Sequence, residues 1–228
     1  METKGYSPEQ LAKIVKGKLI QKAAAPDIEN IVLDSRKLSY PDQSVFFAIK
    51  GARRDGHQFI GELHDKGIRN FVLSDLIEEG SLPDANVIKV KDTVLALQLL
   101  AANHRNKFNI PVIGITGSNG KTIVKEWLYQ LLQQDYTIIR SPKSFNSQIG
   151  VPLSVWQMNE MHQLAIFEAG ISQPDEMQNL QKIIQPAIGI FTNIGKAHSE
   201  GFLNIRQKIN EKLKLLDRKS TRLNSSHR

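Results

Sequence analysis

The chain has 228 residues, 40% of them hydrophobic, which is enough for one large or two modest domains with cores of their own. It contains no cysteine, which excludes disulfides, thiolate zinc sites, iron–sulfur clusters and cysteine nucleophiles, so any bound metal must have oxygen or nitrogen ligands. The formal net charge is +7, but residues 218–228 hold four of the basic side chains and no acid, so the rest is only mildly basic.

Membrane and nucleic-acid signals are absent from the sequence. The first ten residues lack the apolar core of a signal peptide, and no run of 18 apolar residues follows. No Lys/Arg run is interleaved with aromatic residues, a pattern typical of nucleic-acid binding. We therefore predict a cytoplasmic protein that neither inserts into a membrane nor binds nucleic acid, and whose mild positive charge favours anionic ligands.

The first ninety residues combine short apolar runs with two helix signals. A capping sequence at Ser7 predicts a helix that ends at Gly17, and a second helix is expected around residues 57–66. Gly, Pro and Asp separate four apolar runs that read as short strands, namely 28–33, 45–49, 71–73 and 87–90. The pattern predicts a small α/β domain over residues 1–90.

Strands and helices alternate regularly after Asp92. A long helix rich in Leu and Ala ends near Phe108. Strands are then expected at 112–116, 137–139, 164–168 and 187–192, and helices at 122–133, 149–158, 175–184 and 205–216. This alternation predicts a doubly wound parallel sheet, which binds ligands at the carboxyl ends of its strands. We expect residues 91–217 to form an incomplete second domain and residues 218–228 to be a non-native or disordered tail.

A glycine-rich turn joins the strand at 112–116 to the following helix. It reads Thr116-Gly117-Ser118-Asn119-Gly120-Lys121-Thr122. Backbone N–H groups in such a turn bind phosphate oxygens, Lys121 can reach and neutralise the β- and γ-phosphates, and the Thr122 hydroxyl can ligate Mg²⁺. The strict phosphate-loop consensus fails at Ile115, so an ordinary glycine-rich turn is the alternative. No Asn-Lys-x-Asp stretch reads guanine, which favours ATP and predicts a P-loop-containing ATPase domain.

The loop, with Lys125 and Glu126 beyond it, resembles the ATP loop of the Mur ligase family, whose members form amide bonds with ATP in peptidoglycan precursor synthesis. Further segments resemble that family in the expected order, namely 34–36, 45–48, 55–59, 144–152, 168–170 and 197–202. The resemblance covers nearly all of residues 30–216. It implies a UDP-sugar-binding domain at residues 1–90, a partial central ATP-binding domain at 91–217, and ATP and Mg²⁺ as cofactors.

Two segments, 146–152 and 198–202, resemble the members that add D-alanyl-D-alanine to UDP-N-acetylmuramoyl-tripeptide through an acyl phosphate. Some relatives of this kind are fused to a downstream alanine racemase domain. The alternatives are a ligase of the same family that adds a diamino acid or glutamate, and a nucleotide- and UDP-sugar-binding module without turnover. Because the family has a third, carboxy-terminal domain, we expect the fragment alone to be inactive.

Besides Thr122, the metal site that the resemblance implies uses three residues. Glu168 ends an apolar strand at the mouth of the sheet, where a carboxylate suits Mg²⁺ and a solvated charge is the alternative. His198 and Lys212 are implied as catalytic metal ligands, the lysine after carbamylation by CO₂. Lys208 and Lys214 are rivals of Lys212, and a solvated helix face is the simpler interpretation of all three lysines.

Substrate-binding residues are implied in both domains. Ser35 and Arg36 would bind the uracil or diphosphate part of the UDP-sugar substrate, since an arginine can donate two hydrogen bonds to one anionic group. Asp55 and His57 fall in a segment of the same domain, although Asp-Gly before an apolar run is also an ordinary helix-capping signal. Asn146 would bind substrate or position the phosphate, with a plain loop role as its alternative.

Overall fold

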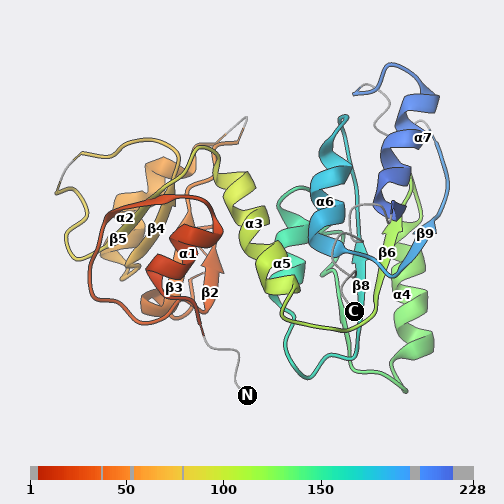
Figure 1. Ribbon diagram of the computed structural model, residues 1–228, viewed down its shortest axis with the longest axis horizontal. Coiled ribbons are helices and arrows are strands. Elements are labelled where there is room, and N and C mark those ends of the chain that lie inside the picture. Colours follow the sequence, from red (N-terminus) through yellow and green to blue (C-terminus); the bar gives the residue numbers. More distant parts are fainter. Residues whose placement is uncertain (1–4, 37, 52–53, 79, 196–200, 218–228) are drawn as a thin grey trace, which may run out of the picture. The chain divides into compact units, whose positions relative to one another are not determined.

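The computed structural model describes residues 5–36, 38–51, 54–78, 80–195 and 201–217. The tail predicted at 218–228 lies outside the described residues. The chain divides into two compact units, residues 1–100 and 101–228, and each is described here by itself (Figure 1). The division falls inside helix α3 (Thr93–Arg105), whereas the sequence places a boundary at residue 90.

The first helix of unit 1, α1 (Pro8–Ile14), begins with the predicted capping box. The Gln10 backbone N–H donates to Ser7 Oγ (3.2 Å), and the Ser7 N–H donates to Gln10 Oε1 (3.0 Å). These two bonds satisfy N–H groups that have no partner within the helix. The helix ends before Gly17, so its prediction is confirmed.

Unit 1 is built on a five-stranded sheet with the order β1-β5-β4-β3-β2. Its strands are β1 (Lys18–Gln21), β2 (Asn30–Val32), β3 (Ser44–Phe47), β4 (Asn70–Leu73) and β5 (Asn86–Lys89). Strands β2 to β5 pair in parallel and correspond to the four predicted apolar runs. Strand β1, which the sequence analysis missed, pairs antiparallel with β5 at the edge. The α/β class predicted for this unit is confirmed.

Three short helical segments complete unit 1. They are the 3₁₀ turns η1 (Pro41–Gln43) and η2 (Gly56–Phe59) and the helix α2 (Ile60–Asp65). Turn η2 and helix α2 together form the helix predicted at residues 57–66, and η1 was not predicted. Ile60 and Leu63 of α2 lie in the core with Phe46 and Phe71 of the sheet, which fixes η2 at the carboxyl end of β3.

The sheet of unit 2 has four strands, all parallel, in the order β7-β8-β6-β9. They are β6 (Val112–Thr116), β7 (Ile138–Arg140), β8 (Leu164–Glu168) and β9 (Ile188–Phe191). Successive residues of β8 alternate between two apolar cores, one on each face of the sheet. Such a strand reads as a continuous apolar run because both faces are covered. The predicted doubly wound parallel sheet is confirmed.

Helices cover both faces of this sheet (Figure 1). Helix α4 (Lys121–Leu132) packs on one face, and α5 (Gly150–Trp156) and α6 (Glu176–Ile184) contribute to the core on the other. The last predicted helix is α7 (Ile205–Leu213) followed by the 3₁₀ turn η3 (Lys214–Leu216). The tighter final turn places Leu216 on Gly189 of β9, where a Cβ atom would collide with it. Among the described helices, none is long and apolar enough to cross a membrane.

Candidate functional site

Two glycines shape the loop between β6 and α4. Gly117 has φ +140°, and a Cβ atom there would lie 2.0 Å from Thr192 Oγ1. Gly120 has φ +81° and is the residue from which α4 begins. Both backbone conformations favour glycine, and at Gly117 a side chain would also collide with Thr192. The loop therefore presents its backbone at the amino terminus of a twelve-residue helix, an arrangement that fits a phosphate group.

The end of β9 holds this loop in place. Thr192 N–H donates to Thr116 O (2.9 Å), and Thr192 Oγ1 donates to Asn119 O (2.6 Å). Ser118 N–H donates to the Asn193 carbonyl (2.9 Å), and Asn119 N–H donates to Asn193 Oδ1 (3.1 Å). The loop conformation is thus fixed by residues more than seventy positions away in the sequence.

Lys121 lies across the loop that precedes it. Its ammonium donates to Gly117 O (3.0 Å) and to Ser118 O (3.4 Å). Burial lowers the pKa of Lys121, and the nearby Glu168 carboxylate opposes that shift. A partly desolvated cation with only carbonyl partners gains most from an anion placed over the loop.

Thr122 and Glu168 meet where α4 begins and β8 ends. Thr122 Oγ1 donates to Glu168 Oε2 (3.1 Å), and the Glu168 side chain is fully buried. The other carboxylate oxygen, Oε1, forms an ion pair with the buried Lys125 ammonium (2.9 Å). A buried carboxylate beside a hydroxyl is a hard oxygen donor set, which fits Mg²⁺.

Asn146 reaches the same carboxylate from the loop between β7 and α5. Its Nδ2 lies 3.5 Å from Glu168 Oε2, a long hydrogen bond. The backbone carbonyl of Asn146 accepts a hydrogen bond from the Gly170 N–H (2.7 Å). A Cβ atom on Gly170 would lie 2.7 Å from the side-chain oxygen, Asn146 Oδ1. The loop that carries Asn146 is therefore seated against the segment that follows β8.

Two buried lysines of α7 lie near the phosphate loop. The Lys212 ammonium donates to Gly117 O (3.2 Å), and the Lys208 ammonium donates to Gly195 O (2.6 Å). Burial lowers the pKa of Lys212 to about 8, and the positive charges of Lys121 and Lys208 add to the shift. The solvated helix face considered for all three lysines does not apply to Lys208 and Lys212, which are 1% and 2% exposed.

The predicted substrate residues of unit 1 lie in turns. Ser35 O accepts a bond from the Lys66 ammonium (3.3 Å). The Arg36 guanidinium is largely exposed and binds Asp34 through Nε (2.9 Å) and Nη2 (2.7 Å). Asp34 raises the pKa of Arg36. The Nε and Nη2 groups of Arg36 are therefore already bonded within the turn.

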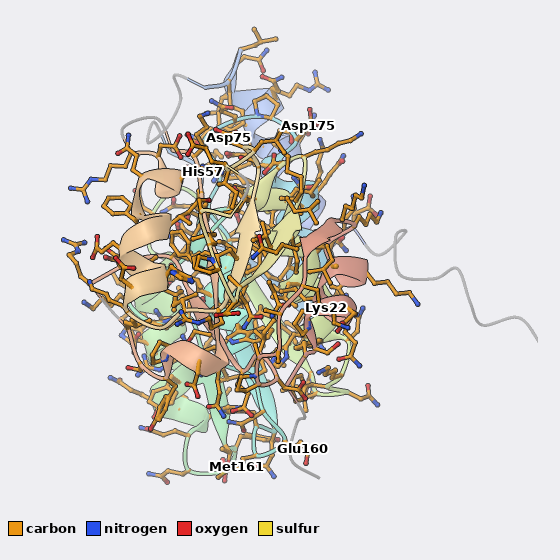
Figure 2. All side chains as sticks on the ribbon, turned by 90° about the vertical axis from the view of Figure 1, so that its left-hand side faces the viewer. Lys22, His57, Asp75, Glu160, Met161 and Asp175 are labelled. Carbon is orange, nitrogen blue, oxygen red and sulfur yellow. The ribbon has the colours of Figure 1, made fainter. Side chains whose placement is uncertain are left out.

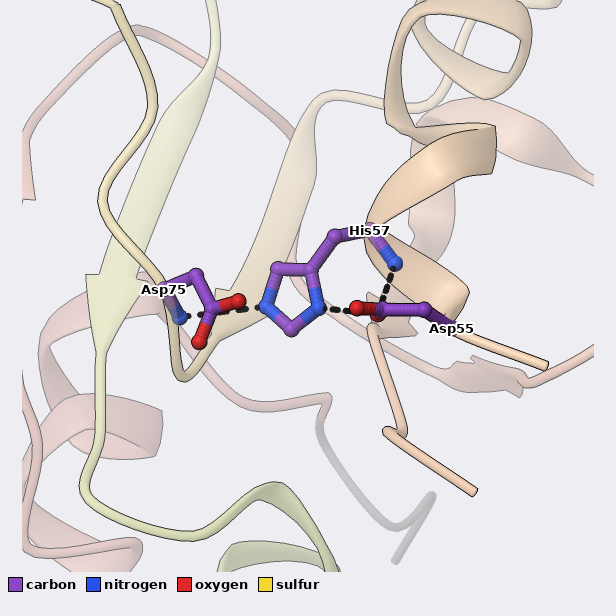
Figure 3. A group of neighbouring side chains, drawn as sticks. All are labelled: Asp55, His57 and Asp75. Atoms are coloured by element: carbon purple, nitrogen blue, oxygen red, sulfur yellow. Dashed lines mark hydrogen bonds and ion pairs between the residues drawn. The ribbon is translucent and has the colours of Figure 1, made fainter. Parts of the chain in front are cut away.

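His57 connects two loops at the carboxyl ends of β3 and β4, where it is a neighbour of Asp75 (Figures 2 and 3). Its Nε2 accepts bonds from the N–H groups of Ser74 and Asp75 (both 3.1 Å). Nε2 therefore carries no proton, and Nδ1–H donates to Asp55 Oδ1 (2.6 Å). Asp55 also accepts from the His57 N–H (2.9 Å), which is the capping role weighed for it in the sequence.

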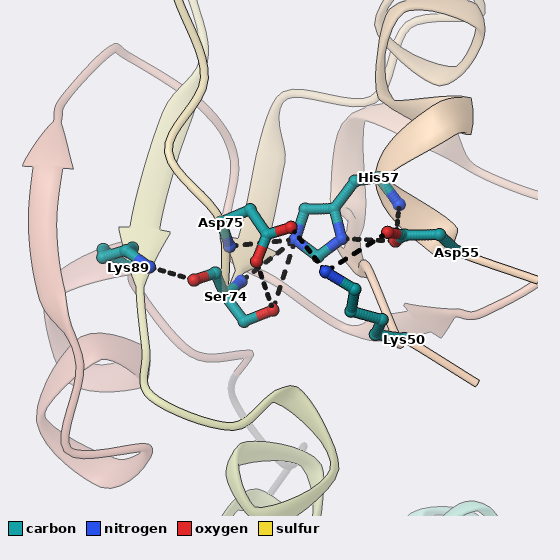
Figure 4. A network of polar contacts seen from close by, with 6 residues as sticks. All are labelled: Lys50, Asp55, His57, Ser74, Asp75 and Lys89. Atoms are coloured by element: carbon teal, nitrogen blue, oxygen red, sulfur yellow. Dashed lines mark hydrogen bonds and ion pairs between the residues drawn. The ribbon is translucent and has the colours of Figure 1, made fainter. Parts of the chain in front are cut away.

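Asp55, His57 and Asp75 are close enough together to hold a metal ion, but their bonding favours a structural role. Both nitrogens of His57 are engaged, so neither offers a lone pair to a cation. The Lys50 ammonium lies 3.0 Å from Asp75 Oδ2 and 3.7 Å from Asp55 Oδ2, so a cation already faces both carboxylates (Figure 4). The network fastens the two loops.

Two matches to known families cover most of the chain. Residues 115–223 match the Mur ligase middle domain, and residues 27–105 match the Mur ligase family, catalytic domain. The chain belongs to the Mur ligase family.

Two similar proteins are both named UDP-N-acetylmuramoyl-tripeptide–D-alanyl-D-alanine ligase. The Bacillus subtilis protein is 35% identical over 197 residues, which are 84% of this chain and 42% of that protein. The Haemophilus influenzae protein is 36% identical over 200 residues, 86% of this chain and 42% of that protein. The chain thus spans less than half the length of these Mur ligases.

Solved structures of Mur ligases resemble the chain as well. MurF from Acinetobacter baumannii superposes with a TM-score of 0.84 at 28% identity, covering 94% of this chain and 47% of that one. A MurF ligase from Thermotoga maritima, solved in complex with ADP, gives a TM-score of 0.73 at 31% identity and covers 82% and 42%. These likenesses confirm the predicted fold class.

Most Mur ligase residues singled out in unit 2 lie close together in the structure. Thr122, Glu168 and Asn146 are in contact, and Lys121 and Lys212 share the carbonyl of Gly117 as an acceptor. His198 lies outside the described residues. The metal ligation and substrate binding assigned to these residues stay predictions.

The sequence analysis gave no role to three residues at this site. Thr192 and Asn193 hold the loop, but they are distant in sequence and ordinary in type. Lys125 is fully buried on α4 and lies 2.9 Å from Glu168 Oε1. A signal existed for Lys125, because it shares helical spacing with Leu128 and Leu132 on the apolar side of that helix.

Proposed function

We propose that the whole protein to which this chain belongs adds D-alanyl-D-alanine to UDP-N-acetylmuramoyl-tripeptide with ATP, in the cytoplasmic stage of peptidoglycan synthesis. The meeting of Thr122, Glu168 and Asn146 beside the phosphate loop carries the proposal, because three separate elements supply these side chains at the carboxyl ends of parallel strands. The names of the similar proteins from B. subtilis and H. influenzae support the same reaction.

The proposed reaction has two steps. A substrate carboxylate attacks the γ-phosphorus of ATP, which forms an acyl phosphate and releases ADP. The amine of D-alanyl-D-alanine then attacks the acyl carbon, and phosphate leaves. Both transition states concentrate negative charge, so cations and aimed N–H donors supply most of the catalysis. Lys121 would neutralise the transferring phosphoryl group from its place above the loop.

Magnesium would be held by the Thr122 hydroxyl and the Glu168 carboxylate, with His198 proposed as a further ligand. Bound Mg²⁺ supplies positive charge at phosphate oxygens. Asn146 would orient substrate at the same place, since its amide already lies beside Glu168. Burial of Glu168 would exclude water from this part of the site.

Lys212 is proposed to become a carbamate. Its amine nitrogen would bond to the carbon of CO₂ and lose a proton, which converts a cation into a carboxylate-like group. The reaction needs an unprotonated amine, and a pKa of about 8 leaves a larger unprotonated fraction near neutral pH than an ordinary lysine has. Removal of bicarbonate should slow the whole enzyme; an unchanged rate, together with an active Lys212→Ala variant, would refute the carbamate.

Unit 1 is proposed to bind the UDP-sugar part of the substrate through Ser35 and Arg36. Arg36 is exposed and can keep its bond to Asp34 while its remaining N–H groups donate to a diphosphate. Asp55 and His57 would act there by holding the neighbouring loops, in addition to the substrate contacts predicted for them. A downstream racemase domain remains a prediction.

An amine-specificity assay tests the proposed function. The whole protein is incubated with ATP, Mg²⁺ and the UDP-linked tripeptide, and amide formation is measured with D-alanyl-D-alanine, a diamino acid or glutamate. Only D-alanyl-D-alanine should give a product. Preference for another amine would assign the protein to a different Mur ligase reaction, and ATP binding without product from any amine would favour a binding module.

A further inference from the structure

Lys125 is a buried lysine beside Glu168, one of the proposed magnesium ligands. It is on the face of α4 that packs on the sheet, one turn after Thr122, and its side chain is fully buried. Its ammonium lies 2.9 Å from Glu168 Oε1 and 3.3 Å from Glu126 Oε1. A buried lysine in contact with a buried carboxylate needs an explanation, because both charges have left water.

The remaining contacts of Lys125 fix the loop that follows β7. The ammonium donates to Ser141 O (2.9 Å) and to Lys143 O. Ser141 in turn accepts a bond at Oγ from the Glu168 N–H (3.1 Å). Lys125 therefore joins the helix after the phosphate loop, the carboxylate that ends β8, and the segment leading to Asn146.

The two oxygens of Glu168 face different partners. Oε1 lies against the Lys125 ammonium, while Oε2 faces Thr122 Oγ1. With one oxygen attracted to a fixed cation, rotation of the carboxylate is restricted. Residues that hold metal ligands in this way alter metal affinity without touching the ion.

We propose that Lys125 is a positioning residue for Glu168: by holding Oε1 it keeps Oε2 directed at the Thr122 hydroxyl and so sets the affinity of the site for Mg²⁺. The proposal rests on the proposed function only in that Thr122 and Glu168 are taken to hold this ion. A second cation also repels Mg²⁺, and we expect the fixed orientation of the fully buried carboxylate to outweigh that repulsion.

The test measures how binding of a non-hydrolysable ATP analogue to this 228-residue chain depends on Mg²⁺ concentration, by titration calorimetry. Lys125→Gln is the main variant, because its amide can still donate to Ser141 O and Lys143 O but carries no charge. Its Mg²⁺ midpoint should rise about tenfold to a hundredfold. Binding at saturating Mg²⁺ should approach that of the wild type. Lys182→Gln, which removes an exposed charge from the same unit, should leave the midpoint unchanged.

A double-mutant cycle separates positioning from general structural support. In a Glu168→Gln background, Lys125→Gln should not change the Mg²⁺ midpoint further. An equal change in both backgrounds, or an unchanged or lower midpoint in Lys125→Gln itself, overturns the proposal. If Lys125→Gln does not fold, Lys125→Arg is measured instead. The arginine keeps the positive charge but has a wider head group, so the Mg²⁺ midpoint should rise measurably, though less than the rise expected when the charge is lost. A wild-type midpoint in that variant overturns the proposal.

Failure of the inference differs from failure of the proposed function. If the wild-type chain binds the analogue with no dependence on Mg²⁺, the magnesium site itself is wrong and the role of Lys125 falls with it. If the wild type depends on Mg²⁺ and Lys125→Gln depends on it equally, the site stands and only the positioning role fails. Mn²⁺ electron paramagnetic resonance provides a direct count of the bound ion in each variant.

Discussion

The polar groups around His57 in unit 1 and those around Glu168 in unit 2 are satisfied to different degrees. His57 uses both ring nitrogens, and Asp55 accepts two bonds from that one residue. In the cluster around Glu168, in contrast, the Lys121 ammonium has only carbonyl partners, although Glu168 itself is paired with Lys125. Both clusters hold a carboxylate and a cation at the ends of parallel strands, so residue type alone does not distinguish them.

The difference shows how to tell a fastening network from a reactive site. A network whose donors and acceptors are matched within the protein stabilises the loops that it joins. A buried group with unused bonding capacity costs stability and is retained where a ligand completes it. By this criterion we place the proposed nucleotide and metal site in unit 2, and we interpret the bonds of Asp55 and His57 as fastening the loops of unit 1.

The largest expected effect is in unit 2. Lys121→Ala should lower ATP-dependent turnover of the whole protein by a factor of about 10² to 10³ or more, because a cation facing the transferring phosphoryl group is lost. Its thermal stability should not fall, since the ammonium is partly desolvated and has no carboxylate partner at bonding distance. Phosphate release is the measurement, with Lys182→Ala as the matched control. Near-normal turnover would contradict the phosphate-loop assignment.

The next effect concerns a structural histidine of unit 2. His104 Nε2–H donates to Met158 O (3.0 Å), and burial lowers its pKa to about 4. An unfolded histidine titrates near its ordinary value of 6.5, so below that pH the unfolded chain binds a proton that the folded chain does not. Stability should therefore be fully present above pH 6.5 and fall by about 3 kcal/mol toward pH 4.

Urea unfolding of the wild type and of His104→Gln between pH 4.5 and 7.5 tests this prediction. The variant should lose the part of the pH dependence that His104 contributes. The same slope of stability against pH in both proteins would contradict the assignment of this pH dependence to buried His104.

A smaller effect is expected in unit 1. His57→Ala leaves the N–H groups of Ser74 and Asp75 without their acceptor, which should destabilise the loops by about 2 kcal/mol. Amide hydrogen exchange at Ser74 and Asp75 should become faster. Nucleotide binding by unit 2 should not change. Loss of Mg²⁺-dependent nucleotide binding in this variant would show that the two regions are not separable in the way described.

The smallest effect comes from the capping box of α1. Ser7→Ala removes the acceptor for the Gln10 N–H and should lower the free energy of unfolding by about 1 kcal/mol. The measurement is urea unfolding followed by circular dichroism, with Ser7→Thr as the control that keeps a capping hydroxyl. Equal stability of the Ala and Thr variants would contradict the role of the cap.

Much of the fold could be predicted because its signals are local. In unit 2, strands buried on both faces read as apolar runs, and the intervening helices carry apolar residues at helical spacing. Strand β1 was not predicted because it has only four residues, with a charged side chain at one end and an amide at the other. Its extended conformation is stabilised by pairing with β5, which is distant in sequence. The helix expected at residues 205–216 ends in a 3₁₀ turn, and the contact of its Leu216 with Gly189 joins residues that are remote in sequence.

The site shows the same limit. The loop from Thr116 to Thr122 could be found because its residues are consecutive and chemically distinctive. Asn193 could not be assigned a role in this way, and the helical spacing of Lys125 indicates burial but not its partner, since both roles depend on distant groups that the fold brings together. Sequence reasoning also could not decide between capping and substrate binding for Asp55, and the structure adds the observed cap.

The most direct test of the account is the Mg²⁺ dependence of ATP-analogue binding to this chain in the wild type and in Glu168→Gln. We predict that the wild type binds the analogue more tightly with Mg²⁺ than without it, and that Glu168→Gln shifts the Mg²⁺ midpoint to a higher concentration while remaining folded. Equal Mg²⁺ dependence in both proteins, or none in the wild type, would contradict the assignment of the nucleotide and metal site to unit 2.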